Sequence, residues 1–241
     1  MTGRVAVVTG AARGIGAATV RGLVAAGWSV VAVDRAADDP RLPYHLGTRA
    51  ELGALAGDRV RTVVADATDA DAMAGAVGLA EGDFGGVDAA LAVAGVIAGG
   101  RPLWEMPAAE LDAVLEVDLR GAVTLARVAV PALLRRPEPR SGRFVAVASA
   151  AATRGLPLLA AYCAAKAGVT GLVRALAVEL GGTGVTANAV SPGSTDTAIL
   201  AESARLYGLG SAAEFAHQQP VGRLLDPAEV EIGRASCRER V

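Results

Sequence analysis

The stretch TGAARGIG, residues 9–16, follows a short apolar run (RVAVVT, 4–9) and precedes a segment rich in alanine and leucine. Gly10, Gly14 and Gly16 allow a tight turn and let backbone N–H groups approach a pyrophosphate, which the positive end of the following helix also attracts. A glycine-rich turn by itself is also an ordinary strand–helix connection. At this position it predicts the start of a βαβ unit that binds a dinucleotide.

The same alternation of apolar runs and periodic segments continues along the chain. Further runs lie at 29–33, 60–65, 87–94, 143–149 and 185–191, and helical patterns lie near 14–26, 69–82, 107–135 and 160–181. Nearly continuous apolar runs are typical of parallel strands that are buried on both faces. The pattern therefore predicts a single α/β domain with a doubly wound parallel sheet, with ligands bound beyond the carboxyl ends of the strands.

Composition excludes several functional classes. The chain has 241 residues, is 52% hydrophobic and has a net charge of −2, so it lacks the basic surface typical of proteins that bind nucleic acid or anionic membranes. No apolar run approaches the roughly 18 residues of a membrane span, and the N-terminus has no signal-peptide pattern. Two cysteines make no disulfide framework, and His45 and His217 are isolated, so no metal site is predicted. We expect a cytoplasmic protein with a small-molecule substrate and no nucleic-acid or membrane partner.

Carboxylates follow the second and third apolar runs. Asp34 comes about 20 residues after the glycine turn, where a carboxylate accepts hydrogen bonds from ribose hydroxyls and repels a 2′-phosphate. This favours NAD over NADP, although Arg13 and Arg35 lie where an arginine can hold that phosphate. Asp66, in VVADAT, can bond the adenine amino group or cap the following helix; the sequence leaves both open.

A catalytic group is predicted around SAAATRGLPLLAAYCAAK, residues 149–166. Tyr162 and Lys166 are four residues apart on a predicted helix and so share a face. A phenol has a pKa of about 10 and needs a nearby cation to exchange a proton near neutral pH, which Lys166 provides. Ser149 ends the fifth apolar run, where its hydroxyl can hold a substrate oxygen.

From Gly3 to about Val230 the chain resembles the short-chain dehydrogenase/reductase family. The resemblance rests on TGAARGIG, Asp66, AVAG (92–95), Ser149, Tyr162, Lys166 and NAVSPGSTDT (188–197). It implies a Rossmann fold in which Tyr162 is the general acid/base, Lys166 lowers its pKa and binds the nicotinamide ribose, and Ser149 polarises the substrate carbonyl. The cofactor-binding residues that it implies are Gly10, Arg13, Gly14, Ile15, Gly16, Asp34, Asp66, Ala94, Gly95, Tyr162, Lys166, Pro192, Gly193, Thr195 and Thr197.

Two positions depart from the family pattern. The family's Asn-Asn-Ala-Gly is Ala92-Val93-Ala94-Gly95 here, so side-chain amides are lost while close backbone approach is kept. The family's helix asparagine, which helps to hold a water beside the lysine, falls on Asp118. We expect Asp118 either to pair with Lys166 and blunt its effect on Tyr162, or to bond backbone groups within its own helix.

An insert, residues 34–52 (DRAADDPRLPYHLGTRAEL), is longer than an ordinary βα connection of about 2–6 residues. LPYHLGTRAEL resembles the insert of short-chain dehydrogenases associated with mycofactocin, a peptide-derived redox cofactor. The resemblance implies that NAD is held without ready exchange and is reoxidised in place, with Pro43, Tyr44 and Leu46 as a lid. The alternative is an exposed surface loop.

The substrate pocket is predicted from apolar residues near the catalytic group. Val96, Ile97, Leu156, Leu158 and Leu159 would line it, with residues 198–215 as a lid helix. Ordinary core packing explains the same pattern equally well. An apolar pocket favours a nonpolar alcohol or carbonyl compound.

The chain ends on EIGRASCRERV, residues 231–241, which has no apolar period. IGRASCRERV is what a common sequencing adapter encodes in one frame, so we predict a domain at 1–230 and a non-native tail at 231–241. The family's last helix and seventh strand would then be lacking. The family also implies a homodimer or homotetramer for the full-length protein.

These observations favour an NAD-dependent oxidoreductase that transfers a hydride between an alcohol or carbonyl substrate and nicotinamide, with cofactor reoxidation by mycofactocin. One alternative is a conventional reductase that exchanges NAD(P)H freely. Another is a catalytically silent dinucleotide-binding sensor, suggested by Asp118 and the altered 92–95 segment; intact Ser149, Tyr162 and Lys166 argue against it.

Overall fold

The computed structural model describes residues 3–230, so the predicted tail at 231–241 lies outside the described residues. Six parallel strands form one sheet in the order β3-β2-β1-β4-β5-β6. The chain adds β2 and β3 on one side of β1 and β4 to β6 on the other, which is the strand order of a doubly wound fold. The strands are β1 Val5–Thr9, β2 Ser29–Asp34, β3 Val60–Val64, β4 Ala89–Ala92, β5 Arg143–Val147 and β6 Thr186–Val190. Five predicted runs contain their strands, and β2 extends one residue beyond its run, to Asp34, so the expected fold class is confirmed.

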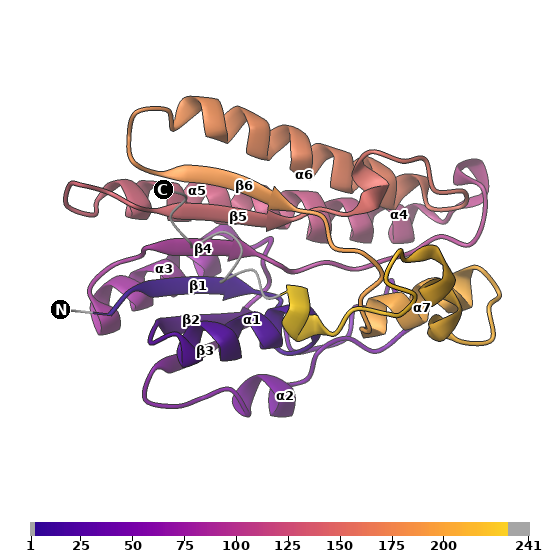
Figure 1. Ribbon diagram of the computed structural model, residues 1–241, viewed down its shortest axis with the longest axis horizontal. Coiled ribbons are helices and arrows are strands. Elements are labelled where there is room, and N and C mark those ends of the chain that lie inside the picture. Colours follow the sequence, from indigo (N-terminus) through magenta and orange to yellow (C-terminus); the bar gives the residue numbers. More distant parts are fainter. Residues whose placement is uncertain (1–2, 231–241) are drawn as a thin grey trace.

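Helices cover both faces of the sheet, and the strands end at the edge near α7 (Figure 1). The helices are α1 Gly14–Ala25, α2 Arg49–Gly53, α3 Ala70–Phe84, α4 Ala108–Val114, α5 Gly121–Leu134, α6 Ala160–Glu179 and α7 Ala198–Leu206. Short 3₁₀ segments lie at Leu103–Glu105, Ala150–Ala152, Ala212–Gln218 and Pro227–Val230. Within the described residues, β3 and β6 are the edge strands.

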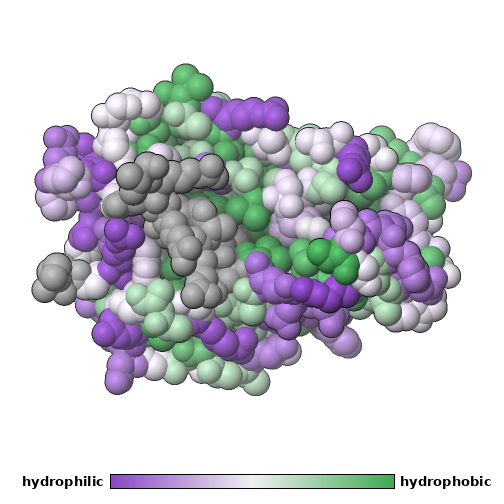
Figure 2. Space-filling model, viewed as in Figure 1, coloured by the Kyte–Doolittle hydropathy of each residue, from purple (hydrophilic) through white to green (hydrophobic). Residues whose placement is uncertain are grey.

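Side chains of β1 show why the apolar runs are continuous. Val5 and Val7 pack in the cluster on the α3 and α5 side, whereas Ala6 and Val8 pack in the cluster on the α1 side. Successive side chains of a strand point to opposite faces, so a strand covered on both faces buries every residue. On the face shown in Figure 2, hydrophilic residues occupy most of the periphery and hydrophobic residues gather near the middle.

Two predicted helices differ from the structure. The segment expected at 107–135 is interrupted by a π-helical turn, Leu115–Arg120, between α4 and α5. Such a turn contains an extra residue and is frequent at functional sites; here it contains Asp118. The lid expected at 198–215 is α7 followed by a loop and the 3₁₀ segment Ala212–Gln218, because Gly208, with φ of 67°, ends the helix.

One described helix, α6, is long and apolar enough to cross a membrane by length and composition. In the fold, α6 packs against β6, the π-helical turn and the 3₁₀ segment after β5. Core helices of water-soluble domains pass the same test, and α6 carries Tyr162 and Lys166.

Candidate active site

The glycine turn brings the backbone of β1 close to two other segments. A Cβ on Gly10 would lie 2.6 Å from the backbone of Ala94, and a Cβ on Gly16 would lie 1.9 Å from the carbonyl oxygen of Gly10. Both positions therefore exclude side chains, and Gly10 also has a φ of 67°. Gly10, Gly14, Gly16, Arg13 and Ile15 all line a cavity with a volume of about 770 Å³.

The ends of β2 and β3 form what we call the adenosine end of this cavity, lined by Asp34, Arg35 and Asp66. Asp34 accepts hydrogen bonds from the backbone N–H groups of Ala12 (2.9 Å) and Ala36 (2.8 Å), which fix its carboxylate. The Arg35 guanidinium bonds Asp39 at 2.8 Å and lies 3.9 Å from Asp66.

Asp66 does not cap α3. Its Oδ1 accepts hydrogen bonds from the backbone N–H and the hydroxyl of Thr68, whereas Asp69 caps the helix by accepting from the N–H groups of residues 71 and 72. The capping interpretation of Asp66 is therefore wrong, because Asp69 directly precedes α3 and occupies the N-cap position. The Asp66 carboxylate lines the cavity.

The insert is held by ion pairs at its base. Asp39 is 1% exposed and bonds Arg35 and, through both carboxylate oxygens, Arg41. Arg41 also pairs with Glu116 of the π-helical turn, at 2.6 Å. These contacts attach the insert to the segment that carries Asp118.

The expected lid is only partly as predicted. Leu46 and Gly47 line the cavity, but Pro43 is exposed. Tyr44 is not among the lining residues of the cavity, and the backbone N–H of Ile97 donates to its hydroxyl oxygen at 2.9 Å. This contact joins residues far apart in the sequence, and no local pattern indicates it.

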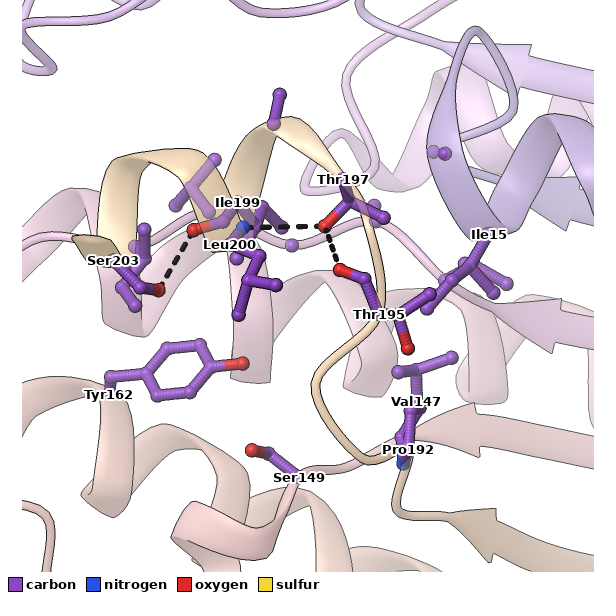
Figure 3. A pocket seen from close by; sticks show the side chains of 18 of the residues that line it. Ile15, Val147, Ser149, Tyr162, Pro192, Thr195, Thr197, Ile199, Leu200 and Ser203 are labelled. Atoms are coloured by element: carbon purple, nitrogen blue, oxygen red, sulfur yellow. Dashed lines mark hydrogen bonds between the residues drawn. The ribbon is translucent and has the colours of Figure 1, made fainter. Parts of the chain in front are cut away.

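Tyr162, Ser149 and Lys166 converge on the centre of the cavity. Figure 3 shows the Tyr162 ring reaching into the space below α7, with the Ser149 hydroxyl on the same side. Ser149 caps the 3₁₀ segment after β5 by accepting from the N–H of Ala151 at 3.2 Å. Lys166 Nζ donates to the carbonyl oxygen of Val147 at 3.1 Å and lies 5.5 Å from the centre of the Tyr162 ring.

Asp118 pairs with Lys166. Its Oδ2 lies 3.0 Å from Lys166 Nζ, and the two side chains are 0% and 4% exposed. Its Oδ1 accepts from the backbone N–H of Val96 at 2.7 Å. Since Val96 belongs to the segment after β4, the expectation that Asp118 bonds only backbone groups of its own helix is wrong.

This pair influences the proton affinity of Tyr162. Burial raises the pKa of Tyr162, the Lys166 cation acts in the opposite direction, and the Asp118 carboxylate raises the pKa further. Burial is the largest influence on Lys166 and lowers its pKa, but Asp118 and Tyr162 together outweigh it, so the pKa of Lys166 is raised. Lys166 is therefore a cation at neutral pH.

The segment after β4, residues 93–95, is held by Thr9 and lies beside Lys166. The Thr9 hydroxyl oxygen accepts hydrogen bonds from the N–H groups of Val93 (3.2 Å) and Ala94 (3.3 Å), a role that sequence reasoning missed. A Cβ on Gly95 would lie 3.3 Å from Lys166 Nζ, so glycine keeps room for the ammonium group. Ala94 and Gly95 both line the cavity.

The turn after β6 closes the cavity from the other side. Pro192, Gly193, Thr195 and Thr197 all line it. The Thr195 hydroxyl donates to Gly193 O at 3.0 Å, and Thr197 caps α7 by accepting from the N–H of Leu200. These bonds fix the turn against which a ligand would lie.

The substrate end of the cavity lies between α7 and the β5–α6 connection. Val96, Ile97, Leu156 and Leu159 line it as expected, whereas Leu158 does not. Leu158 is 39% exposed, and its carbonyl oxygen accepts from the N–H of Gly100. The segment expected over the pocket, residues 198–215, contributes Ile199, Leu200, Ser203, Tyr207, Leu209 and Phe215 to the lining. The sequence-based expectation missed four further lining residues, Arg154, Pro157, Gln218 and Gln219.

A search of residues 3–230 finds no group of three or more histidine, cysteine or carboxylate side chains that could hold a metal ion. The side chains that converge in the cavity are instead a phenol, a hydroxyl and an ammonium group. They are suited to proton transfer at a substrate oxygen.

Comparison with known proteins identifies the relatives of this chain. The family described as short chain dehydrogenase matches residues 4–207. Cis-4-hydroxycyclohexanecarboxylate dehydrogenase of Sinomonas cyclohexanicum is 39% identical over 231 residues, which cover 94% of this chain and 86% of that protein. 2-Dehydro-3-deoxy-L-rhamnonate dehydrogenase (NAD(+)) of Sphingomonas sp. (strain SKA58) is 35% identical over 198 residues, which cover 82% of this chain and 74% of that protein. The crystal structure of carveol dehydrogenase from Mycobacterium avium in complex with NAD has a TM-score of 0.87 and 28% identity, and the match covers 97% of this chain and 90% of that one.

Proposed function

Since the chain belongs to the short-chain dehydrogenase family and is an oxidoreductase, we propose that it is an NAD-dependent alcohol dehydrogenase or carbonyl reductase with Tyr162 as general acid/base. The observation that carries the proposal is the convergence of Tyr162, Ser149 and Lys166 on a cavity whose opposite end is the glycine turn. The proposed substrate is a small alcohol or the corresponding carbonyl compound.

The residues of the cavity fit NAD. Gly10 and Gly16 let the turn pack closely against its own backbone neighbours, and both line the cavity at the start of α1, where backbone N–H groups can approach pyrophosphate oxygens. Asp34 is fixed at the adenosine end, where its carboxylate can accept from ribose hydroxyls. Arg35 is already paired with Asp39, which supports NAD over NADP. When bound, the nicotinamide cofactor would supply the hydride-transfer chemistry, in either direction.

The protein's own residues would move the proton. Ser149 would hold the substrate oxygen beside Tyr162, and Tyr162 would take the hydroxyl proton during oxidation or return it during reduction. Lys166 would stabilise the phenolate by its charge, while Asp118 would hold Lys166 in place and weaken that effect.

We further propose that NAD exchanges slowly and is reoxidised in place by mycofactocin. The support is the resemblance of the insert, together with its anchors: Asp39 to Arg41, Arg41 to Glu116, and Ile97 to Tyr44. Opening the insert for cofactor release would break contacts with two separate segments. By resemblance to the family, we also propose a homodimer or homotetramer, which sedimentation analysis tests.

One experiment separates these readings. Protein purified without added cofactor is denatured, the released nucleotide is identified by mass spectrometry, and an alcohol panel is assayed with either an artificial electron acceptor or added NAD. Trapped NAD predicts released nucleotide and turnover with the acceptor alone. Empty protein that turns over with added NAD would support the conventional reductase.

The matched control is Tyr162→Phe, which removes only the phenolic hydroxyl. General acid/base catalysis contributes about 10²–10⁴-fold, so we expect a loss of that size with NAD content unchanged. Turnover that survives this change would contradict the proposed role of Tyr162. Bound NAD without turnover of any alcohol in the unaltered protein would favour the sensor.

A further inference from the structure

The ionisable side chains that line the cavity differ in whether they have partners. At the adenosine end, Arg35 bonds Asp39, and at the centre Lys166 bonds Asp118. Arg13 lies in the glycine turn, where the cofactor's pyrophosphate is expected. On the substrate side, Arg154 is the one ionisable residue among the described lining residues apart from the tyrosines.

Arg154 has a fixed backbone and an available guanidinium. Its N–H donates to Ala150 O at 3.0 Å, and its carbonyl oxygen accepts from the Cys163 thiol at 3.8 Å. This places Arg154 on the connection from Ser149 to Tyr162, and Cys163 is the neighbour of Tyr162 on α6. Within residues 3–230 the guanidinium makes no hydrogen bond or ion pair, and the residue is exposed and belongs to the cavity lining.

The surroundings of Arg154 are apolar. Leu156, Pro157 and Leu159 follow it on the same connection, and Ile199 and Leu200 of α7 line the cavity opposite. Figure 3 shows Ile199 and Leu200 reaching down from α7 toward the space above Tyr162. Tyr207 joins the two walls, because its hydroxyl donates to Pro157 O at 2.9 Å. A ligand here meets an apolar wall with one cation.

We propose that Arg154 binds a carboxylate of the substrate, so that the substrate is a hydroxy acid, or its oxo form, with an apolar carbon frame between the two groups. The proposal rests on the proposed function, because it assumes that the alcohol carbon lies at Tyr162. A carboxylate is ionised at neutral pH, and arginine binds carboxylates through two parallel hydrogen bonds. The apolar frame would pack against the leucines and Ile199.

The test compares an acid with its neutral ester. The full chain with its bound NAD is assayed with 4-hydroxycyclohexanecarboxylate and with the methyl ester of that acid, in the unaltered protein, Arg154→Met and Arg154→Lys. For a partly exposed ion pair we expect Arg154→Met to raise KM for the acid about five- to tenfold, with little change for the ester or in kcat. Arg154→Lys keeps the charge and should restore part of the preference.

The control variant is Arg174→Met. Arg174 is also exposed, makes no side-chain hydrogen bond or ion pair within residues 3–230 and does not line the cavity. It should leave both KM values unchanged. Equal effects of Arg154→Met on acid and ester, or an unaltered protein that does not prefer the acid, would overturn the proposal.

A binding measurement keeps the inference testable if neither compound is oxidised. Calorimetry measures the binding of cyclohexanecarboxylate and of methyl cyclohexanecarboxylate to the NAD-containing protein. The proposal is supported if the acid binds more tightly than the ester and Arg154→Met abolishes the difference. Equal binding of the acid and the ester by the unaltered protein would overturn it. Failure of the proposed function has a different signature, namely no oxidation of any alcohol, charged or neutral.

Discussion

Two groups of ion pairs support the cavity, and they differ in burial and geometry. The Lys166–Asp118 pair at the centre has side chains that are 4% and 0% exposed, and each partner also bonds a backbone group. The group at the base of the insert buries only Asp39, while Arg35, Arg41 and Glu116 are 35%, 28% and 45% exposed. The central pair determines the charge near Tyr162, whereas the group at the base of the insert attaches the insert to the π-helical turn.

This difference in burial predicts which property of the protein a substitution at each group should change. A buried ion left without its partner costs far more than an exposed one, because water cannot replace the lost partner. We therefore expect changes at the central pair to affect stability and pH dependence. Changes at the insert should act mainly on the retention of the cofactor.

The largest expected effect is that of Lys166→Met. Asp118 would remain buried with no cation, which costs about 3–5 kcal/mol of unfolding free energy. Urea denaturation followed by circular dichroism measures this. Lys166→Met with Asp118→Leu should recover much of the loss, since an apolar pair leaves no buried charge. A single variant as stable as the unaltered protein would contradict the role of burial.

Asp39→Asn should have the next largest effect. It removes the carboxylate that joins Arg35 and Arg41, at a cost of about 2 kcal/mol, because the arginines are partly solvated. We expect faster release of bound NAD, measured by the dilution of labelled nucleotide. Asp58→Asn, at an exposed carboxylate without a side-chain partner among the described residues, is the control. Unchanged retention in Asp39→Asn would remove the insert from the trapping proposal.

The Asp39 anchor should persist down to strongly acidic pH. The hydrogen bond from Arg41 is the largest cause that holds the pKa of Asp39 below its usual range. A lowered carboxyl pKa contributes stability that is present above the unfolded value of about 3.9 and is lost as the pH falls through the folded value. NAD retention should therefore be insensitive to this group near neutral pH.

Asp118→Asn should shift the pH dependence of the rate. The Asp118 carboxylate raises the pKa of Tyr162, so its removal lowers that pKa. Alcohol oxidation needs the phenolate, so its rate should rise at a lower pH, by about one pH unit for one neighbouring charge. The asparagine oxygen can still accept from Val96 N–H, which keeps the geometry. Superimposable pH–rate profiles would refute the prediction.

The smallest effect should come from Glu116→Gln. It weakens the contact with Arg41 but leaves Asp39 in place, so the cost should be about 0.2–1 kcal/mol and should shrink at high salt. The measurement is the rate of NAD release at low and high ionic strength. An effect as large as that of Asp39→Asn would show that the two ends of the Arg41 contact are equally important.

Much of the fold and of the candidate site could be predicted from local patterns. The apolar runs mark strands because strands covered on both faces bury every side chain, and the spacing of Tyr162 and Lys166 places them on one face of a helix. The start of α3 could not be predicted in this way, since residues 66–69 contain two aspartates and a threonine that could each be the N-cap. Only the hydrogen bonds identify Asp69 as the cap.

The sequence by itself determined the doubly wound sheet, the glycine turn and the shared helix face of Tyr162 and Lys166, because these follow from periodicity and backbone sterics over a few residues. Tertiary structure decided which groups meet across the chain: Tyr44 with Ile97, Arg41 with Glu116, and Asp118 with Lys166 and Val96. It also decided that Arg154 has no partner among the described residues while Arg35 has one. Such contacts depend on how distant segments pack, and no local spacing encodes that.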